Sequence, residues 1–179
     1  MNLRNIVENL VEIFLEAGDL ALQLREKGLI KKIKTDKTPV SNGDLEVNRL
    51  ISAKISEVTP DLPIISEETS ENRDNQNLKD FWLIDPIDGT YDYIHNRDEF
   101  TLNAGLIINK EAVAGIIYAP AKDRMFYSYG NKLSYELKNG KEEIINNKEI
   151  DKNYIKAVSY SNNLKAEIID IHKKLNVKE

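Results

Sequence analysis

The chain has 179 residues, 41% of them hydrophobic, which suits one domain with a real core and is short for two. Its net charge is only -5 although 31% of the residues are charged, so we expect no polycationic surface and no nucleic-acid partner. Cysteine is absent, which excludes disulfides and thiolate metal sites and agrees with a cytoplasmic location. Acidic residues interrupt the apolar pattern of residues 1–20, so neither a signal peptide nor an integral membrane segment is expected.

Two amphipathic helices are predicted at the start of the chain. Apolar residues recur at three- and four-residue steps over residues 6–24, and Gly28 supplies a stop. A second apolar stripe covers residues 45–58, and it is preceded by Ser41 and Asp44 in the spacing of a capping box.

Short apolar runs typical of strands follow the helices. They cover residues 62–65, 81–84, 101–108, 112–118, 125–129, 133–137 and 141–145. Asn109-Lys110 and Asn139-Gly140 are turn pairs between neighbouring runs, so antiparallel pairing is expected. Residues 155–179 are interpreted as a strand followed by a helix.

The sequence DFWLIDPIDGTYDYI at residues 80–94 places two carboxylates at the end of a buried strand. Pro86 is expected to stop the strand, which leaves Asp85 at its end and Asp88 in the following turn. Two carboxylates are tolerable there if a divalent cation lies between them, and the N–H groups of a short helix that follows favour phosphate. Asp-Pro and Asp-Gly are also ordinary turn sequences, and that alternative stays open.

A second acidic pair follows another short strand. Glu67 and Glu68 come directly after the run that begins at residue 62, and we expect them to converge on the same edge of the sheet. Each acid also has an ordinary interpretation, since Ser66 suits an N-cap followed by glutamates and Asp44 suits a capping box. The prediction of a metal and phosphate site therefore depends on the combination.

The polar stretch at residues 31–42 is predicted to be an exposed loop or a loose hairpin. Its lysines are Lys31, Lys32, Lys34 and Lys37. They are either ligands for a second phosphate of the substrate or a solvated run of charge. His95 and His172 lie in no recognisable catalytic setting and are predicted to be surface or helix residues.

The segment WLIDPIDGT at residues 82–90, after KTDKTPVSNGDLE and SEE, is similar to the signature of the lithium-sensitive, magnesium-dependent phosphatases that include inositol monophosphatase. SEE, Asp92 after DGTY, DEFTLNAGLI and GIIYAPAKDRMFYS resemble the 3'(2'),5'-bisphosphate nucleotidase branch. The resemblance implies an α+β layered sandwich, with a mainly antiparallel sheet flanked by two long N-terminal helices. The predicted elements agree, and we expect one such domain over residues 1–179.

The resemblance implies Mg2+-dependent hydrolysis of adenosine 3',5'-bisphosphate to AMP and phosphate by water activated at two metal ions, in sulfate assimilation. An inositol or sugar monophosphatase is the alternative. The implied residues are the metal ligands Glu67, Asp85, Ile87 through its carbonyl and Asp88, the substrate-binding residues Glu67, Ile87, Asp88, Gly89 and Thr90, and the catalytic residues Asp44, Glu67 and Thr90. Asp44 and Thr90 are implied to orient the water, and Glu68 to support the metal.

The sequence also departs from this pattern. In the longer family members, an aspartate in a Trp-Asp motif of a second domain completes the second metal site, whereas Trp82 is the only tryptophan here. We therefore expect either a missing second half or a truncated, inactive product. A sheet face left uncovered leads to the hypothesis of a homodimer. Gly43 stands where the family more often has alanine, which is expected to loosen the start of the second helix.

Overall fold

The computed structural model of the protein describes residues 1–34, 38–69, 78–130, 133–145, 155–157 and 164–178. The chain divides into two compact units, Met1–Ile145 and Asn146–Glu179. Among the helices within these ranges, none combines the length and the apolar character that crossing a lipid bilayer requires. The single domain over residues 1–179 stays a prediction.

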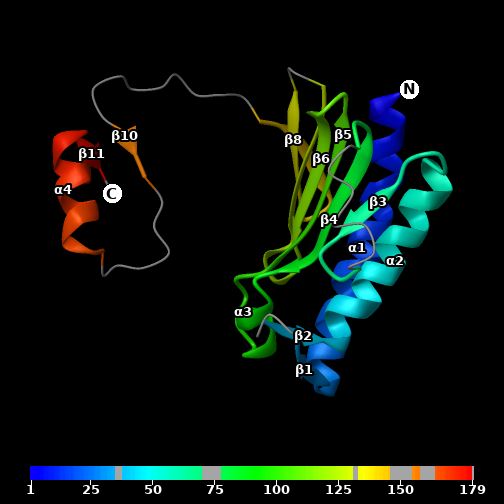
Figure 1. Cartoon of the computed structure of the whole chain (residues 1–179), viewed down its shortest axis with the longest axis horizontal. Helices are drawn as coiled ribbons and strands as arrows, with labels where there is room; N and C mark the ends of the chain where they lie inside the picture. The colour runs from blue at the N-terminus through cyan, green and yellow to red at the C-terminus, as the bar shows by residue number, and fades with distance from the viewer. Residues whose placement is uncertain (35–37, 70–77, 131–132, 146–154, 158–163, 179) are drawn as a thin grey trace. The chain divides into compact units, whose positions relative to one another are not determined.

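Two long helices form one layer of the first unit (Figure 1). Helix α1 spans Leu3–Lys27 and is followed by Gly28, as the sequence predicts. Helix α2 spans Asn42–Val58 and begins with a capping box. The Ser41 side chain accepts from the backbone in the first turn of the helix, and the Asp44 side chain accepts from the Ser41 N–H. The side chain of Asp44 thereby satisfies an N–H group that the helix itself leaves unpaired.

Seven strands form the second layer, in the order β3-β4-β5-β6-β7-β8-β9. They are β3 (Ile64–Ser66), β4 (Phe81–Asp88), β5 (Thr101–Ile108), β6 (Glu111–Ala119), β7 (Arg124–Tyr129), β8 (Ser134–Lys138) and β9 (Lys141–Ile144). Only β3 and β4 run parallel within this sheet, and the turns at 109–110 and 139–140 join antiparallel neighbours as predicted. A separate hairpin of β1 (Lys31–Ile33) and β2 (Pro39–Ser41) lies between the two helices in sequence.

The core lies between the helices and one face of the sheet. Helix α1 packs on β6 and β7, and α2 packs on β4. Strand alternation directs every second side chain into this layer. The largest fully buried side chains there include Phe14, Leu10, Ile51, Trp82 and Ile116, and each contributes about 1.5–3 kcal/mol when removed from water. The predicted α+β sandwich with a mainly antiparallel sheet and two N-terminal helices is confirmed.

Strand β4 continues past the point where the sequence predicts its end. Asp85 pairs with Asn103 and Asp88 pairs with Thr101, so three steps on β4 oppose two on β5 and the strand contains a bulge. The prediction that Pro86 stops the strand is therefore wrong. A bulge leaves one residue out of the hydrogen-bond ladder, and a proline without an N–H group is accommodated there.

The second unit holds a short parallel pair and one helix. Strand β10 (Ile155–Lys156) pairs with β11 (Val177–Lys178), and helix α4 covers Ala166–Lys174. The predicted order of strand and then helix is confirmed. No residue of α4 is buried.

Gly43, in the first turn of α2, leaves room for the ring of Tyr93. A Cβ atom at this glycine would lie 2.4 Å from the Tyr93 hydroxyl oxygen. That hydroxyl donates a 2.7 Å hydrogen bond to the carbonyl of Ala21 in α1, and the Tyr93 side chain is fully buried. The glycine thus has a packing role between α1, α2 and α3 (Thr90–Ile94).

We expect Gly43→Ala to lower the free energy of unfolding by about 1–3 kcal/mol, because the added methyl group forces Tyr93 out of its place. Urea unfolding of the two proteins measures this difference. Gly115→Ala is the matched control, since its Cβ would lie 3.7 Å from the nearest heavy atom, the Ala104 carbonyl oxygen. A Gly43→Ala protein as stable as the wild type would contradict the packing role.

Candidate active site

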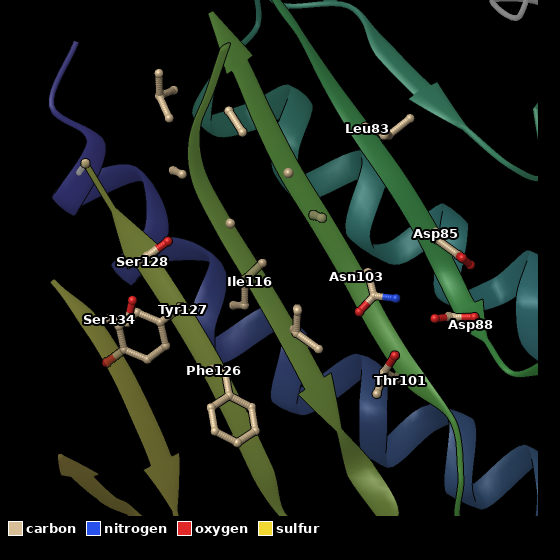
Figure 2. A pocket seen from close by; sticks show the side chains of 18 of the residues that line it. Leu83, Asp85, Asp88, Thr101, Asn103, Ile116, Phe126, Tyr127, Ser128 and Ser134 are labelled. Atoms are coloured by element: carbon tan, nitrogen blue, oxygen red, sulfur yellow. The ribbon is translucent and has the colours of Figure 1, made fainter. Parts of the chain in front are cut away.

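Two carboxylates lie at the end of β4. Figure 2 shows Asp85 and Asp88 on this strand, beside Asn103 and Thr101 of β5, and all four line one hollow of the sheet. The bend after Asp88 requires Gly89, which has φ 91° and whose Cβ would lie 2.6 Å from the Glu99 carbonyl oxygen. Helix α3 begins directly after this glycine, as the sequence predicts.

Strand β3 brings the second acidic pair to the same place. Because β3 runs parallel to β4, with Ser66 opposite Ile84, both strands end at one edge of the sheet. The Glu67 N–H continues the ladder with a 3.1 Å hydrogen bond to the Ile84 carbonyl. Residues 67 and 68 form a turn, so the alternative of a helix capped by Ser66 does not hold. The predicted convergence of Glu67 and Asp85 follows from this parallel pairing.

The surroundings of Asp85 disfavour the charged form of its carboxyl group. Desolvation, followed by the charges of Glu67 and Asp88, raises the pKa of Asp85 to about 7. Its Oδ1 atom is buried and has no hydrogen-bond partner within the described structure. Burial without a partner is costly for a carboxylate, and a bound cation would remove that cost.

Asp44 and Thr90 form a second pair beside these acids. The Thr90 hydroxyl lies 3.0 Å from Asp44 Oδ1 and 3.0 Å from the Ile87 carbonyl oxygen. The other oxygen of Asp44 accepts from the Ser41 N–H at 2.8 Å and from the Ser41 hydroxyl at 2.6 Å. Asp44 is 1% exposed. It is therefore both the capping-box acid and the partner of Thr90, and its role in orienting water stays a prediction.

Lys34 is the residue whose place the sequence did not indicate. Its ammonium nitrogen lies 2.7 Å from Glu68 Oε1 and 3.2 Å from Glu67 Oε1. Burial opposes the charged form of Lys34, but hydrogen bonds to Glu68 and Glu67 outweigh it and raise the pKa of the lysine. Burial also raises the pKa of Glu68. A solvated run of charge is therefore the wrong interpretation for Lys34.

The other basic residues of the sequence analysis lie elsewhere. Lys31 donates to the Ile94 carbonyl at 3.0 Å, and Lys32 is exposed. Lys37 lies outside the described residues. His95 is exposed, with Nδ1 2.7 Å from the Tyr91 carbonyl oxygen. His172 lies on α4, and both histidines agree with the predicted surface or helix roles.

The donor set of this edge fits a hard divalent cation, because every atom is a carboxylate or carbonyl oxygen. The unpartnered Asp85 Oδ1 is the observation that favours such an ion. As the side chains stand, however, no three acids or histidines within the described ranges are grouped closely enough to hold one. Glu67 Oε1 is directed to Lys34 in this arrangement.

A hollow of about 690 Å3 on the sheet face continues from the two aspartates across β5, β6 and β7. Small residues make its floor, with Gly105 opposite Gly115 and Gly115 opposite Ser128. Asn103 borders it with a buried Oδ1 that lacks a hydrogen-bond partner in the described structure. The sequence alone did not single out Asn103. This residue pairs with Asp85 and so lies on the same face of the sheet, which can be recognised only when the register of β4 and β5 is known.

The metal-free protein is expected to lose stability through Asp85 as the pH rises from about 4 to about 7. The pKa of Asp85 is about 7 in the folded chain and about 3.9 in the unfolded one. Between these two pKa values the unfolded chain has released the Asp85 proton while the folded chain still holds it, so the free energy of unfolding falls as the pH rises. The fall ends once the pH passes the folded pKa. In EDTA, Asp85→Asn should match the wild type near pH 4 and unfold at a higher temperature near pH 8. Equal melting temperatures at both pH values would contradict the shift.

Comparisons with known proteins show the family of this chain. A model described as the inositol monophosphatase family matches residues 2–177. The 3'(2'),5'-bisphosphate nucleotidase CysQ of Buchnera aphidicola is 32% identical over 146 residues, which cover 80% of this chain and 55% of the relative. The CysQ of Salmonella typhimurium is 32% identical over 130 residues, covering 71% of this chain and 53% of the relative. The chain thus spans about half the length of the curated relatives it matches.

Solved structures share the fold. The crystal structure of CysQ from Bacteroides thetaiotaomicron aligns with a TM-score of 0.71 at 24% identity, covering 99% of this chain and 72% of that one. An IMPase from Thermotoga maritima aligns with a TM-score of 0.71 at 22% identity, covering 96% and 66%. The resemblance inferred from the motif at residues 82–90 is confirmed, and the chain belongs to the inositol monophosphatase family.

Proposed function

We propose that the chain carries the catalytic edge of a Mg2+-dependent phosphatase that hydrolyses adenosine 3',5'-bisphosphate to AMP and phosphate. The observation that carries the proposal is the unpartnered, buried oxygen of Asp85, set beside Glu67 and Asp88. The relatives named CysQ support the nucleotide substrate. A neighbouring IMPase/NADP phosphatase structure that contains Mg2+ and phosphate supports the ion.

In this proposal Glu67, Asp85, the Ile87 carbonyl and Asp88 hold Mg2+, and Glu68 supports them. The bound ions supply an activated water and neutralise charge on the phosphoryl oxygens. The backbone of Gly89 and Thr90 holds the phosphate together with Asp88. Each of these groups is a hard oxygen ligand or a backbone N–H donor, which are the types that bind Mg2+ and phosphate.

Asp44 and Thr90 orient the attacking water in the same proposal. The Thr90 hydroxyl has one hydrogen and two acceptors at 3.0 Å, Asp44 Oδ1 and the Ile87 carbonyl oxygen. Because it donates to one of them, its own lone pairs remain to accept a hydrogen bond from water. Ser41 fixes the far oxygen of Asp44, so the carboxylate cannot turn away from Thr90. The hydroxyl oxygen is thus held in place beside Asp44 before substrate arrives.

Phosphate release by the full chain tests the function. With Mg2+ we expect turnover of adenosine 3',5'-bisphosphate and loss of activity in EDTA, and little release from inositol 1-phosphate. Preference for inositol or sugar phosphates would move the chain to the monophosphatase alternative. Mg2+ binding without release from any phosphate ester would overturn the catalytic proposal and favour an inactive fragment. Sulfate assimilation and the cytoplasm stay predictions from the resemblance and the composition.

A further inference from the structure

The acidic edge already contains a cation of its own. Glu67, Glu68, Asp85 and Asp88 bring four carboxyl groups together at the ends of β3 and β4, since the charges of Glu67, Asp88 and Glu68 all act on Asp85. The positive group found between Glu67 and Glu68 is the ammonium of Lys34. The Lys34 side chain is 17% exposed and that of Glu68 is 5% exposed, so the contact with Glu68 is largely screened from water, whereas the Glu67 side chain is 42% exposed.

The hairpin positions this lysine. Lys34 follows directly after β1, and its N–H group donates to the Thr38 carbonyl at 2.8 Å. At the base of the hairpin, Asn42 and Ile30 exchange hydrogen bonds of 3.0 Å and 2.9 Å. The same segment leads into the capping box at Ser41. Lys34 is therefore delivered to the acids by an element anchored at the start of α2.

We propose that Lys34 is a built-in counter-ion of this edge, which competes with the divalent cation for Glu67. The inference rests on the proposed function, because Glu67 is there a ligand of Mg2+. It explains why no three acids are grouped as a ready-made site in the described structure, since Glu67 Oε1 bonds to the ammonium. When an ion binds, Lys34 gives up Glu67 and keeps Glu68, whose contact is the shorter one.

The competition has a definite thermodynamic sign. A divalent ion that binds Glu67 must first displace the Lys34 ammonium from it. The ion is also repelled by the positive charge of the lysine, so both effects weaken the binding of Mg2+. Removing Lys34 should therefore tighten the binding of Mg2+ and destabilise the metal-free chain, where the nearly buried Glu68 loses its partner. A lysine that merely supports the ligands would have the opposite effect on affinity.

The first experiment titrates MgCl2 into the metal-free full chain by calorimetry. Lys34→Met should bind Mg2+ at least about tenfold more tightly than the wild type. A factor of ten corresponds to about 1.4 kcal/mol, close to the Coulomb energy of unit charges about 4 Å apart in water. In EDTA the same variant should melt at a lower temperature, and Mg2+ should raise its melting temperature more than that of the wild type.

Two matched variants separate the contact from net charge. Lys32→Met makes the same change in charge on the same hairpin, but Lys32 is exposed, so its affinity should stay within about twofold of the wild type. Lys34→Arg keeps the positive charge and should stay within about threefold. If Lys32→Met tightens binding as much as Lys34→Met, general electrostatics account for the effect and the inference is overturned.

The second experiment uses the wild-type chain, so it does not depend on the folding of a variant. Reductive methylation followed by mass spectrometry measures the reactivity of each lysine. Lys34 should react several times faster in Mg2+ than in EDTA, while Lys32 should not change. Wild-type binding of Mg2+ with no rise at Lys34, or with affinity unchanged or weakened in Lys34→Met, overturns the inference alone. No Mg2+ binding by either protein overturns the proposed function as well.

Discussion

Substituting Asp88 with asparagine is expected to lower Mg2+-dependent phosphate release by about a thousandfold or more. Asparagine keeps the size of the side chain but removes the negative charge that holds the ion in this proposal. A loss of this size corresponds to about 4 kcal/mol of barrier, since each factor of ten is about 1.4 kcal/mol. Asp88 is exposed at the end of β4, so folding should be unaffected.

Steady-state kinetics with adenosine 3',5'-bisphosphate measure this effect, and thermal unfolding checks the fold. Asp61→Asn is a suitable control, because it makes the same chemical change at an exposed turn after α2. It should keep wild-type activity. Asp88→Asn protein that is folded and retains more than a tenth of the wild-type kcat/KM would remove Asp88 from the catalytic centre.

Thr90→Val is expected to reduce kcat by about a hundredfold, which is within the range for losing one positioned proton-transfer group. Valine has nearly the same shape as threonine but no hydroxyl, so the water loses its acceptor and Asp44 Oδ1 loses its 3.0 Å partner. Thr90→Ser is the matched variant, because it keeps the oxygen and removes only a methyl group. It should stay within about tenfold of the wild type.

The split between kinetic constants distinguishes orientation from binding. A hydroxyl that orients water changes kcat and leaves KM nearly unchanged, whereas a hydroxyl that only binds phosphate changes KM. Thr90→Val also leaves a buried acceptor on Asp44 unpaired, at a cost of about 1–3 kcal/mol in stability. That cost is measured separately by urea unfolding. Equal kcat values for the valine and serine variants would contradict the role in orientation.

The elements of the first unit were predictable because local signals and packing agree. The capping box at Ser41 and Asp44 fixes the start of α2, and the turn at Asn139-Gly140 fixes the hairpin of β8 and β9. Each depends on residues a few positions apart. The convergence of Glu67 on Asp85 was also predicted, although it depends on the parallel register of β3 and β4, which no local signal encodes.

What escaped prediction depends on contacts between distant segments. Nothing near Lys34 in the sequence indicates Glu68, 34 residues later, because the hairpin is placed by tertiary packing. The role of Gly43 was missed for the same reason, since it depends on Tyr93, which packs against the glycine from α3. The ligand roles of Glu67, Asp85, Ile87 and Asp88 stay predictions until an ion is measured.

The bulge in β4 decides which way the chemistry of this edge faces. In an unbroken strand, side chains three positions apart lie on opposite faces of the sheet. Asp85 and Asp88 are three apart, yet both border the same hollow, because the extra residue between them inverts the alternation once. If the same residues formed a regular strand without the bulge, Asp88 would turn toward the helices, so the extra residue between the two acids is what keeps both on the outer face of the sheet.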